Sequence, residues 1–435
     1  MLPTRRTMVA ASLASPLAVA APAATVAAIG GADELKAAER ALAFYVDQGV
    51  KASGGPGDLA VGAWMEEALR ANGFKTERQS FVAPFFDVSE ASLTVGPATA
   101  TVIPQAIVVP TPLDGVEGRL VNRSPWNAGQ PAAGAIVLLQ LPHARWSSAA
   151  VDAVRKPVTA AIAAGAAAVV LVTTGPSGEA LALNADGGKP MFERPVATLA
   201  PRDAAPFFKA AAAETSARLK ITGAGGRRDT FNLIGRLDRG HARWLVVSTP
   251  RSGWFTCAGE RGPGVAVWAL LADWAAKANL PVNLAFVCNS GHEYENLGAT
   301  HLLDAAAPPP SATAFWLHLG ANVAARDWHE AGQRMEPLPS PDPQRFLLAT
   351  PELLPTCRRA FAGQAGLEAP YPLSSGAAGE LTHIVAAGYP KIAGVFGAHR
   401  FHHARADDAR CVAAAPVAAA ASACRNLIQA AISLG

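Results

Sequence analysis

Alternating apolar strands and helices between residues 229 and 435 constrain the fold of this chain more than any other feature of its sequence. Short apolar runs predict buried strands at Phe231–Leu237, Trp244–Ser248, Val282–Asn289, Ala314–Leu319 and Lys391–Phe396. Helical spacing predicts helices at Val265–Lys277, Pro351–Ala365 and Val412–Ser433. Because strands that are apolar on both faces need helices on both sides, we expect an α/β fold, a three-layer α/β/α core around a mixed, largely parallel sheet.

The sequence before residue 229 predicts two further segments. Residues 33–95 begin with two helical stretches and then alternate as strands do, so we interpret them as the first part of the same α/β domain. Residues 96–225 contain a β-α-β pattern, with strands at 134–142 and 167–173 around a helix at 151–164. We expect an inserted domain here, joined to the main part at 229–435 by the glycine-rich Gly223–Arg228, which we interpret as a flexible joint.

The first 28 residues have the pattern of an export signal. Arg5 and Arg6 precede a weakly hydrophobic, alanine-rich stretch with small residues suited to cleavage. Paired arginines at this place predict the twin-arginine export route. After this segment, no uncharged apolar run approaches the ~20 residues that span a bilayer. We therefore expect an exported protein, periplasmic or secreted, with no membrane span in its mature form.

Charge and cysteine content exclude several classes of function. Only 16% of the residues are charged, and 37 basic residues face 34 acidic ones, so no strong positive field exists to attract nucleic acid. We expect a peptide or another small amide as the partner instead. No C-x-x-C pair signals a thiol redox site or a cysteine zinc site. Disulfide pairing stays open among Cys257, Cys288, Cys357, Cys411 and Cys424.

Nine of the ten histidines fall between His241 and His403, which places the candidate chemistry in the α/β part. Ligands of such sheets gather at strand ends. Three groups lie at the end of a predicted strand or shortly after one: His292-Glu293, His318 and His402-His403. The alternatives are a helix-capping role for Glu293, a satisfied buried histidine at 318 and an exposed loop pair at 402–403.

Several stretches, taken in order, resemble the secreted zinc aminopeptidases of metallopeptidase family 28. Residues 231–235 (Phe-Asn-Leu-Ile-Gly) are similar to the family's F-N-V-I-G strand, and residues 262–266 (Gly-Pro-Gly-Val-Ala) to its G-S-G-V-A helix start. Residues 289–298 correspond to its G-x-E-E-x-G-L-x-G stretch. Residues 156–170 resemble the β-rich protease-associated (PA) domain that many members insert before the catalytic core. The resemblance implies this fold with an inserted PA domain, and hydrolysis of peptide or other amide bonds.

The resemblance also implies zinc, but the ligand positions have changed. The family's H-x-D pair falls on Thr249 and Arg251, and neither a hydroxyl nor a permanent cation replaces such a zinc ligand. One of the family's two metal positions is therefore expected to be lost, which leaves at most one zinc ion. Arg251 then becomes a candidate partner for an anion or oxyanion.

The remaining family positions imply a single zinc ion held by two carboxylates and one imidazole. The ligands carried over are Glu260, Glu293 and His403, a trio that leaves one position open, as in a catalytic zinc site. The single zinc of glutaminyl cyclase, a relative of the family, has a trio of the same type. An alternative for Glu260 is an ion pair with Arg251 or Arg261.

Two histidines take the other positions that the family implies. His292 falls on the general base, and a neutral imidazole can accept a proton there. His318 replaces a later aspartate ligand, either as a fourth zinc ligand in a closed site or as a neighbour of Arg251.

Two functions follow from these expectations. The first is an exported amide or peptide hydrolase with a remodelled site that holds at most one metal ion, with His292 as proton acceptor. The second is a non-catalytic binding protein, a pseudo-peptidase, on the same fold. The presence of one complete ligand trio favours the first function. The replacement of the family's residues at the other ligand positions favours the second.

Overall fold

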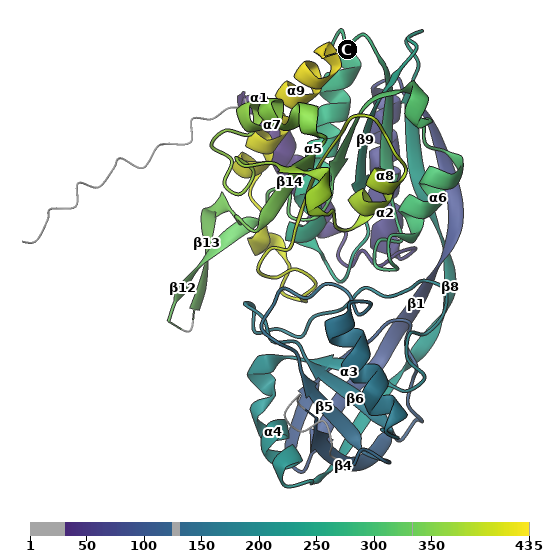
Figure 1. Cartoon of the computed structure of the whole chain (residues 1–435), viewed down its shortest axis with the longest axis vertical. Coiled ribbons are helices and arrows are strands. Elements are labelled where there is room, and N and C mark those ends of the chain that lie inside the picture. The colour runs from purple at the N-terminus through teal and green to yellow at the C-terminus, as the bar shows by residue number, and fades with distance from the viewer. Residues whose placement is uncertain (1–30, 124–130, 333, 435) are drawn as a thin grey trace, which may run out of the picture.

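Two lobes connected by a pair of very long strands make up the chain in the computed structural model (Figure 1), which describes residues 31–123, 131–332 and 334–434. The expected export signal at 1–28 lies outside the described residues. Strands β1 (Lys75–Val95) and β8 (Ser216–Leu237) pair antiparallel from Lys75 to Thr94 and run through both lobes. Within the described residues, no helix is long and apolar enough to cross a membrane.

The larger lobe is built on one sheet with a parallel centre. Its strands follow the order β15 (Tyr371–Pro372), β14 (Arg345–Ala349), β16 (Ile392–Gly397), β11 (Thr313–Leu319), β9 (Trp244–Pro250), β10 (Asn283–Asn289) and β8. Strands β16, β11, β9 and β10 are parallel to their neighbours in this series, whereas β14 and β8 run antiparallel to β16 and β10. The expected mixed, largely parallel sheet is confirmed.

Helices cover both faces of this sheet. One face carries α1 (Ala32–Asp47), α2 (Pro56–Ala71), α5 (Ala258–Lys277), α7 (Leu354–Ala360) and α9 (Ala414–Ser433). The other face carries α6 (Leu297–Ala305) and α8 (Glu380–Ala386). Strand β9 shows why both layers are needed, because Leu245 and Val247 pack into the first layer's core and Val246 packs into the second. The three-layer α/β/α core is confirmed.

The smaller lobe has its own core, and its strands continue the same sheet, because β4 (Val116–Asn122) pairs antiparallel with β8. Its strands are β2 (Ala98–Thr101), β3 (Ile103–Pro104), β4 (Val116–Asn122), β5 (Ile136–Gln140), β6 (Ala168–Val172) and β7 (Val196–Leu199). Helices α3 (Asp152–Ala163) and α4 (Ala205–Ala212) belong to this lobe. Strands β4 to β7 pair in parallel, so the β-α-β pattern predicted from residues 134–173 is present as β5, α3 and β6.

The interpretation of Gly223–Arg228 as a flexible joint is wrong. These residues lie inside β8 and pair with β1, for example Gly225 with Phe86 and Gly226 with Phe85. A Cβ at Gly225 would meet the Phe86 ring at 2.8 Å, so the glycine leaves room for an aromatic ring of the partner strand to lie across it. The glycines here serve packing between strands.

The sequence pattern gave no signal for a hairpin beside the sheet. Strands β12 (Arg326–Ala331) and β13 (Arg334–Pro341) pair antiparallel and project from the larger lobe (Figure 1). Trp328 packs edge-on against Phe401, at 4.8 Å between ring centroids, and so touches the loop after β16. Short 3-10 turns occur at Pro201–Asp203, Pro310–Ala312, Pro351–Leu353, Leu373–Ser375 and Ala409–Cys411.

Candidate functional site

A pocket of about 280 Å³ opens at the carboxyl ends of the parallel strands, where the smaller lobe meets the larger one. Its lining is Ser147, Ser148, Asn184, His292, Glu295, Asn296, His318, Gly320, Ala321, Phe346, Ala378, Gly379, Glu380, Phe396, Gly397, Ala398 and His402. His318 lies in β11, and His292 and His402 lie in the loops after β10 and β16. The expected gathering of histidines at strand ends is present.

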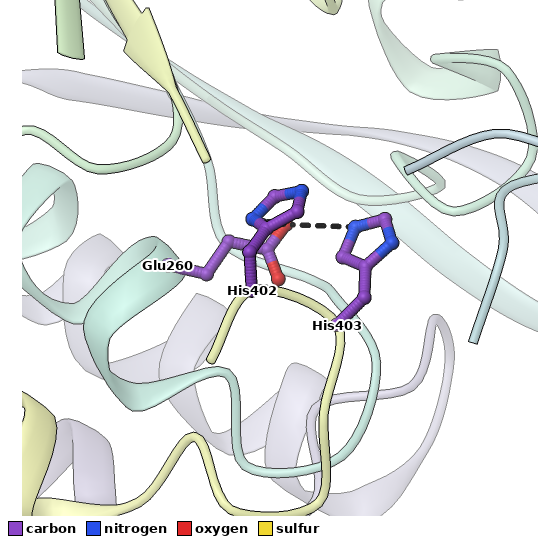
Figure 2. Close-up of side chains that lie close together, drawn as sticks. All are labelled: Glu260, His402 and His403. Carbon is purple, nitrogen blue, oxygen red and sulfur yellow. Dashed lines mark ion pairs between the residues drawn. The ribbon is translucent and has the colours of Figure 1, made fainter. Parts of the chain in front are cut away.

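A carboxylate and two imidazoles meet at one side of this pocket (Figure 2). Glu260 comes from the first turn of α5, and His402 and His403 come from the loop after β16. Each residue offers a ligand atom, and these atoms all lie within 4.8 Å of one another. Glu260 Oε1 is 3.3 Å from His403 Nε2 and 3.9 Å from His402 Nδ1. All three side chains are buried.

The hydrogen bonding of His403 fixes which ring nitrogen faces Glu260. Its Nδ1 is 2.9 Å from the carbonyl oxygen of Ala182, which can only accept, so Nδ1 carries a hydrogen. In the neutral ring, Nε2 then presents a lone pair to the carboxylate oxygen. Two lone pairs at 3.3 Å repel each other unless a cation, a proton or a metal ion, lies between them. Histidines that bind metals commonly donate their other nitrogen to a carbonyl in this way.

Charge and burial act in opposite directions on this cluster. Burial raises the pKa of the Glu260 carboxyl, but Arg261, His402 and His403 together hold it well below its usual range. Burial and the adjacent His403 lower the pKa of His402 well below the ordinary histidine value. The cluster therefore presents an ionised carboxylate and a neutral His402 imidazole. Both Glu260 oxygens are buried without a hydrogen-bond partner.

Asp407 connects the two segments that carry the cluster. Its carboxylate accepts hydrogen bonds from the backbone N–H groups of Gly259, at 2.6 Å, and Glu260, at 3.0 Å, and so caps the start of α5. It also pairs with His399 Nε2 at 3.1 Å. A Cβ at Gly259 would lie 3.0 Å from Asp407 Oδ1, so a glycine is needed for this close approach.

Backbone strain is concentrated around the cluster and the pocket. Phe255, Cys257, Glu295, Asn296 and His403 all adopt φ between 39° and 65°. Such values are unfavourable for residues other than glycine, and they persist where surrounding contacts impose them. The loops that carry the candidate residues are therefore held in defined positions.

Glu293, expected to complete the metal trio, is not in this group. Its Oε2 accepts hydrogen bonds from the hydroxyls of Ser53 and Ser252, both at 2.7 Å, and its Oε1 accepts one from the backbone of Ser53 at 3.0 Å. The carboxylate is buried, and both of its oxygens already accept hydrogen bonds from these donors. His402 lies beside Glu260 and His403 instead. The sequence analysis named His402 only as part of the pair His402-His403 and expected the metal ligand to be His403.

Arg251 lies away from the pocket, in the interior of the larger lobe. Its Nε is 2.9 Å from Asp58 Oδ1, and its other nitrogens donate to the carbonyl oxygens of Cys288 and Phe231. Thr249 donates to the carbonyl oxygen of Leu319 at 2.8 Å. The two residues at the family's H-x-D positions thus hold backbone segments together, and Arg251 is not among the described residues that line the pocket.

The arginine that does reach Glu260 is its neighbour in sequence. Arg261 Nη2 lies 2.6 Å from Glu260 Oε1, and both side chains are buried. Of the two ion pairs considered from the sequence, the pair with Arg261 is the one that forms.

His292 lines the pocket opposite Glu380, a residue that no sequence pattern indicates. Its Nδ1 is 3.8 Å from Oε1 of Glu380, whose Oε2 accepts a hydrogen bond from Asn289 at 2.9 Å. Burial opposes ionisation of Glu380, but contact with His292, together with His318 and Asn289, lowers its pKa. Burial and nearby Arg261 lower the pKa of His292. Glu380 begins α8 directly after Gly379, and no motif marks this position.

His318 faces the pocket but lies outside the close group. Its Nδ1 is 2.9 Å from the hydroxyl of Ser248, which also accepts a hydrogen bond from Trp316. Burial lowers the pKa of His318 to about 4. Neither of the sequence-based positions for His318, a fourth ligand or a neighbour of Arg251, is seen in these contacts.

The smaller lobe completes one wall of the pocket. The hydroxyl of Ser148 donates to Glu295 at 2.6 Å, and the indole of Trp254 donates to Asn184 at 2.8 Å. The backbone N–H of Ala182 donates to the carbonyl of His403, in addition to the bond that orients that ring. Contacts from the smaller lobe therefore reach the candidate ligands themselves.

Zinc fits the Glu260 cluster, whereas the residues at the family's other metal position are not zinc ligands. One carboxylate and two imidazoles are common zinc ligands, and three of them leave one position open. The Glu260 oxygens accept no hydrogen bond, although Oε1 is ion-paired with Arg261, and this agrees with a cation at this place, as does the orientation of His403. At the other family position, the Thr249 hydroxyl and the Arg251 guanidinium are already bound to backbone carbonyls.

Solved structures with the same fold include a zinc aminopeptidase, a second aminopeptidase and a family 28 peptidase precursor. The Bacillus subtilis zinc aminopeptidase BSAP has a TM-score of 0.68 at 16% identity, over 91% of this chain and 95% of its own. The aminopeptidase of Aneurinibacillus sp. strain AM-1 has a TM-score of 0.65 at 15% identity, over 91% and 93%. The peptidase M28 precursor of Shewanella amazonensis SB2B has a TM-score of 0.67 at 13% identity, over 92% and 97%.

The chain therefore has the fold of the family 28 zinc aminopeptidases. No protein-family model and no curated protein matches the chain, so the likeness is one of structure. A shared fold does not carry a shared activity, which has to be argued from the site.

Proposed function

We propose that the protein hydrolyses peptide or other amide bonds with a single zinc ion held by Glu260, His402 and His403. The observation that carries this proposal is the Nε2 of His403 facing the buried carboxylate of Glu260 at 3.3 Å, while Nδ1 is tied to the Ala182 carbonyl and the Glu260 oxygens accept no hydrogen bond. This arrangement is stable with a cation between the two side chains. His402 replaces Glu293 in the ligand set expected from the sequence.

A zinc ion at this place would polarise a carbonyl group or a water molecule. The chain's own residues provide the rest. His292 lines the pocket, and burial keeps its ring neutral by lowering its pKa, so it can accept a proton from water. Glu380, at 3.8 Å from Nδ1, is placed to stabilise the positive charge that His292 would then carry. The walls formed by Phe346 and Phe396 would exclude water from an apolar part of the substrate.

Metal content tests this proposal most directly. Protein purified without added metal is expected to contain about one zinc ion per chain, because three buried ligands bind this metal tightly. Glu260→Gln is expected to lose the zinc. A panel of aminoacyl anilides and of substrates that cyclise to pyroglutamate, assayed with both proteins, then shows whether any activity comes from this site.

A non-catalytic binding protein is the second candidate, favoured by the ion pair between Arg261 and Glu260 at 2.6 Å. A guanidinium at that distance neutralises the carboxylate without any metal. Zinc content near zero, together with equal activity in the wild type and in Glu260→Gln, would favour this candidate over the hydrolase.

We also propose that the chain is exported and that residues 96–225 form a PA-type inserted domain. The paired Arg5-Arg6 and the alanine-rich stretch after them support export. The parallel β4 to β7 sheet with α3 supports a separate inserted unit. Mass spectrometry of the protein from the periplasm or medium is expected to give a mature amino terminus near residue 28.

A further inference from the structure

We propose that Arg261 is a counter-cation that competes with zinc for the Glu260 carboxylate. Its ion pair with Glu260 has to break when zinc binds. Arg261 would thereby set the affinity of the site for zinc. The inference rests on the proposed function only in taking Glu260, His402 and His403 as the ligands.

One oxygen atom is the point of competition. Glu260 Oε1 is 2.6 Å from Arg261 Nη2, 3.3 Å from His403 Nε2 and 3.9 Å from His402 Nδ1. The arginine is charged at every physiological pH. A zinc ion bound to this oxygen and to both imidazoles would place a dication close to the guanidinium, and the two positive charges would repel each other.

Arg261 is anchored in a way that lets its head group leave Glu260. Its Nε donates to the carbonyl oxygen of Ser252 at 3.2 Å, a bond that does not involve the cluster. Its Nη1 and Nη2 are buried without hydrogen-bond partners, because the close contact with Glu260 lacks hydrogen-bond geometry. The charge of Glu260 is therefore the main attraction that holds the head group.

Arg251 shows how a purely structural buried arginine is satisfied in this protein. Its head group donates to the carbonyl oxygens of Cys288 and Phe231, and Asp58 balances its charge. Arg261 has no such set of acceptors although it is only 1% exposed. A buried cation without acceptors is costly, and its placement beside candidate ligands gives it a use there.

Zinc affinity of metal-free protein, measured by competition with a chromophoric zinc chelator, tests the inference. Arg261→Met keeps an unbranched side chain of about the length of the aliphatic part of arginine and removes the charge, so it is expected to bind zinc about tenfold or more tightly than the wild type. Arg261→Lys keeps the charge and is expected to stay within about threefold of the wild type. Arg261→Gln serves as a second neutral variant should the methionine variant fold poorly.

Thermal unfolding supplies a readout that does not depend on activity. Without metal, Arg261→Met leaves the Glu260 carboxylate buried and unpaired, so this variant is expected to melt below the wild type. Added zinc is expected to raise its melting temperature more than that of the wild type, because tighter binding stabilises the folded state further.

The outcomes separate this inference from the proposed function. Equal or weaker zinc affinity in both neutral variants would overturn the role of Arg261 and leave the zinc site intact. Zinc binding by the neutral variants but not by the wild type would support the role of Arg261 and remove the zinc hydrolase. Absence of zinc binding from the wild type and from every variant would overturn both.

Discussion

Asp407 accepts a hydrogen bond from the backbone N–H of Glu260, at 3.0 Å, and this contact joins the loop that carries two candidate ligands to the helix that carries the third. The same carboxylate also binds Gly259 and His399. The geometry of the cluster therefore depends on a residue that does not itself belong to it.

Replacing Asp407 is expected to weaken both the fold and the site. Asp407→Ala removes a helix cap and leaves His399 buried without its charge partner, which is expected to cost about 3 kcal/mol of unfolding free energy. Urea unfolding measures this loss. Zinc affinity is expected to fall in the same variant, and Asp408→Ala, at the half-buried neighbour whose carboxylate pairs with Arg410 and not with α5, is the matched control. An unchanged unfolding midpoint would contradict the role assigned to Asp407.

The buried His318 predicts how stability depends on pH. Its pKa in the folded protein is about 4, below the ordinary value near 6.5, so the unfolded chain binds the proton more readily. The free energy of unfolding is therefore unaffected by His318 above pH ~6.5. It falls by up to about 3 kcal/mol as the pH falls towards 4, because the unfolded chain takes up the proton first.

Chemical denaturation between pH 4 and pH 7 checks this dependence. His318→Gln is expected to lose less stability over that range than the wild type, whereas His143→Gln, at an exposed position, is expected to behave as the wild type. Burial lowers the pKa values of His292 and His402 as well, so part of the dependence is expected to persist in His318→Gln. Identical slopes in all three proteins would refute the assignment to His318.

Glu380 is expected to affect turnover rather than substrate binding. In Glu380→Gln the carboxylate that faces His292 is lost, so kcat is expected to fall roughly tenfold to a hundredfold, with a smaller change in KM. The acidic limb of the kcat profile is expected to move to lower pH, because a neutral amide no longer favours protonation of His292. Glu380→Asp should recover part of the activity. A kcat within twofold of the wild type, with an unmoved pH profile, would exclude the role.

Glu293 provides a test between the sequence-based ligand set and the one in the structure. Because Ser53 and Ser252 already occupy its carboxylate, Glu293→Gln is expected to keep its zinc. Its free energy of unfolding is expected to fall by about 2 kcal/mol, since an amide cannot accept all of these hydrogen bonds. Elemental analysis beside Glu260→Gln gives the comparison, and loss of zinc from the Glu293 variant would restore the sequence-based trio.

The sequence predicted the fold well because apolar spacing is a local property. The strands at Trp244, Ala314 and Lys391 and the helix ending at Ser433 lie within one or two residues of their predicted positions. Gly223–Arg228 was misinterpreted because local propensity reports the flexibility of glycine, whereas pairing with Phe85 and Phe86 of a distant strand decides the outcome.

The site was only partly predictable, because it depends on contacts between segments far apart in the chain. Family positions selected Glu293, but they could not show that Ser53 occupies its carboxylate. His402 and His403 are adjacent, and only the folded loop shows that both imidazoles face Glu260. Glu380 lies on a short helix without any motif, so its approach to His292 becomes visible only in three dimensions.

The long ribbon of β1 and β8 limits how a ligand can enter. The two strands pair from Lys75 to Thr94, with one irregularity between Val88 and Glu90, so the ladder continues from one lobe into the other and sharp bending would break its hydrogen bonds. An opening motion between the lobes would also break the backbone hydrogen bonds from Ala182 to His403 and from Ala185 to Glu293. A ligand therefore has to enter through a preformed opening between side chains. Its cross-section, more than any closing movement of the protein, decides whether it can reach the pocket.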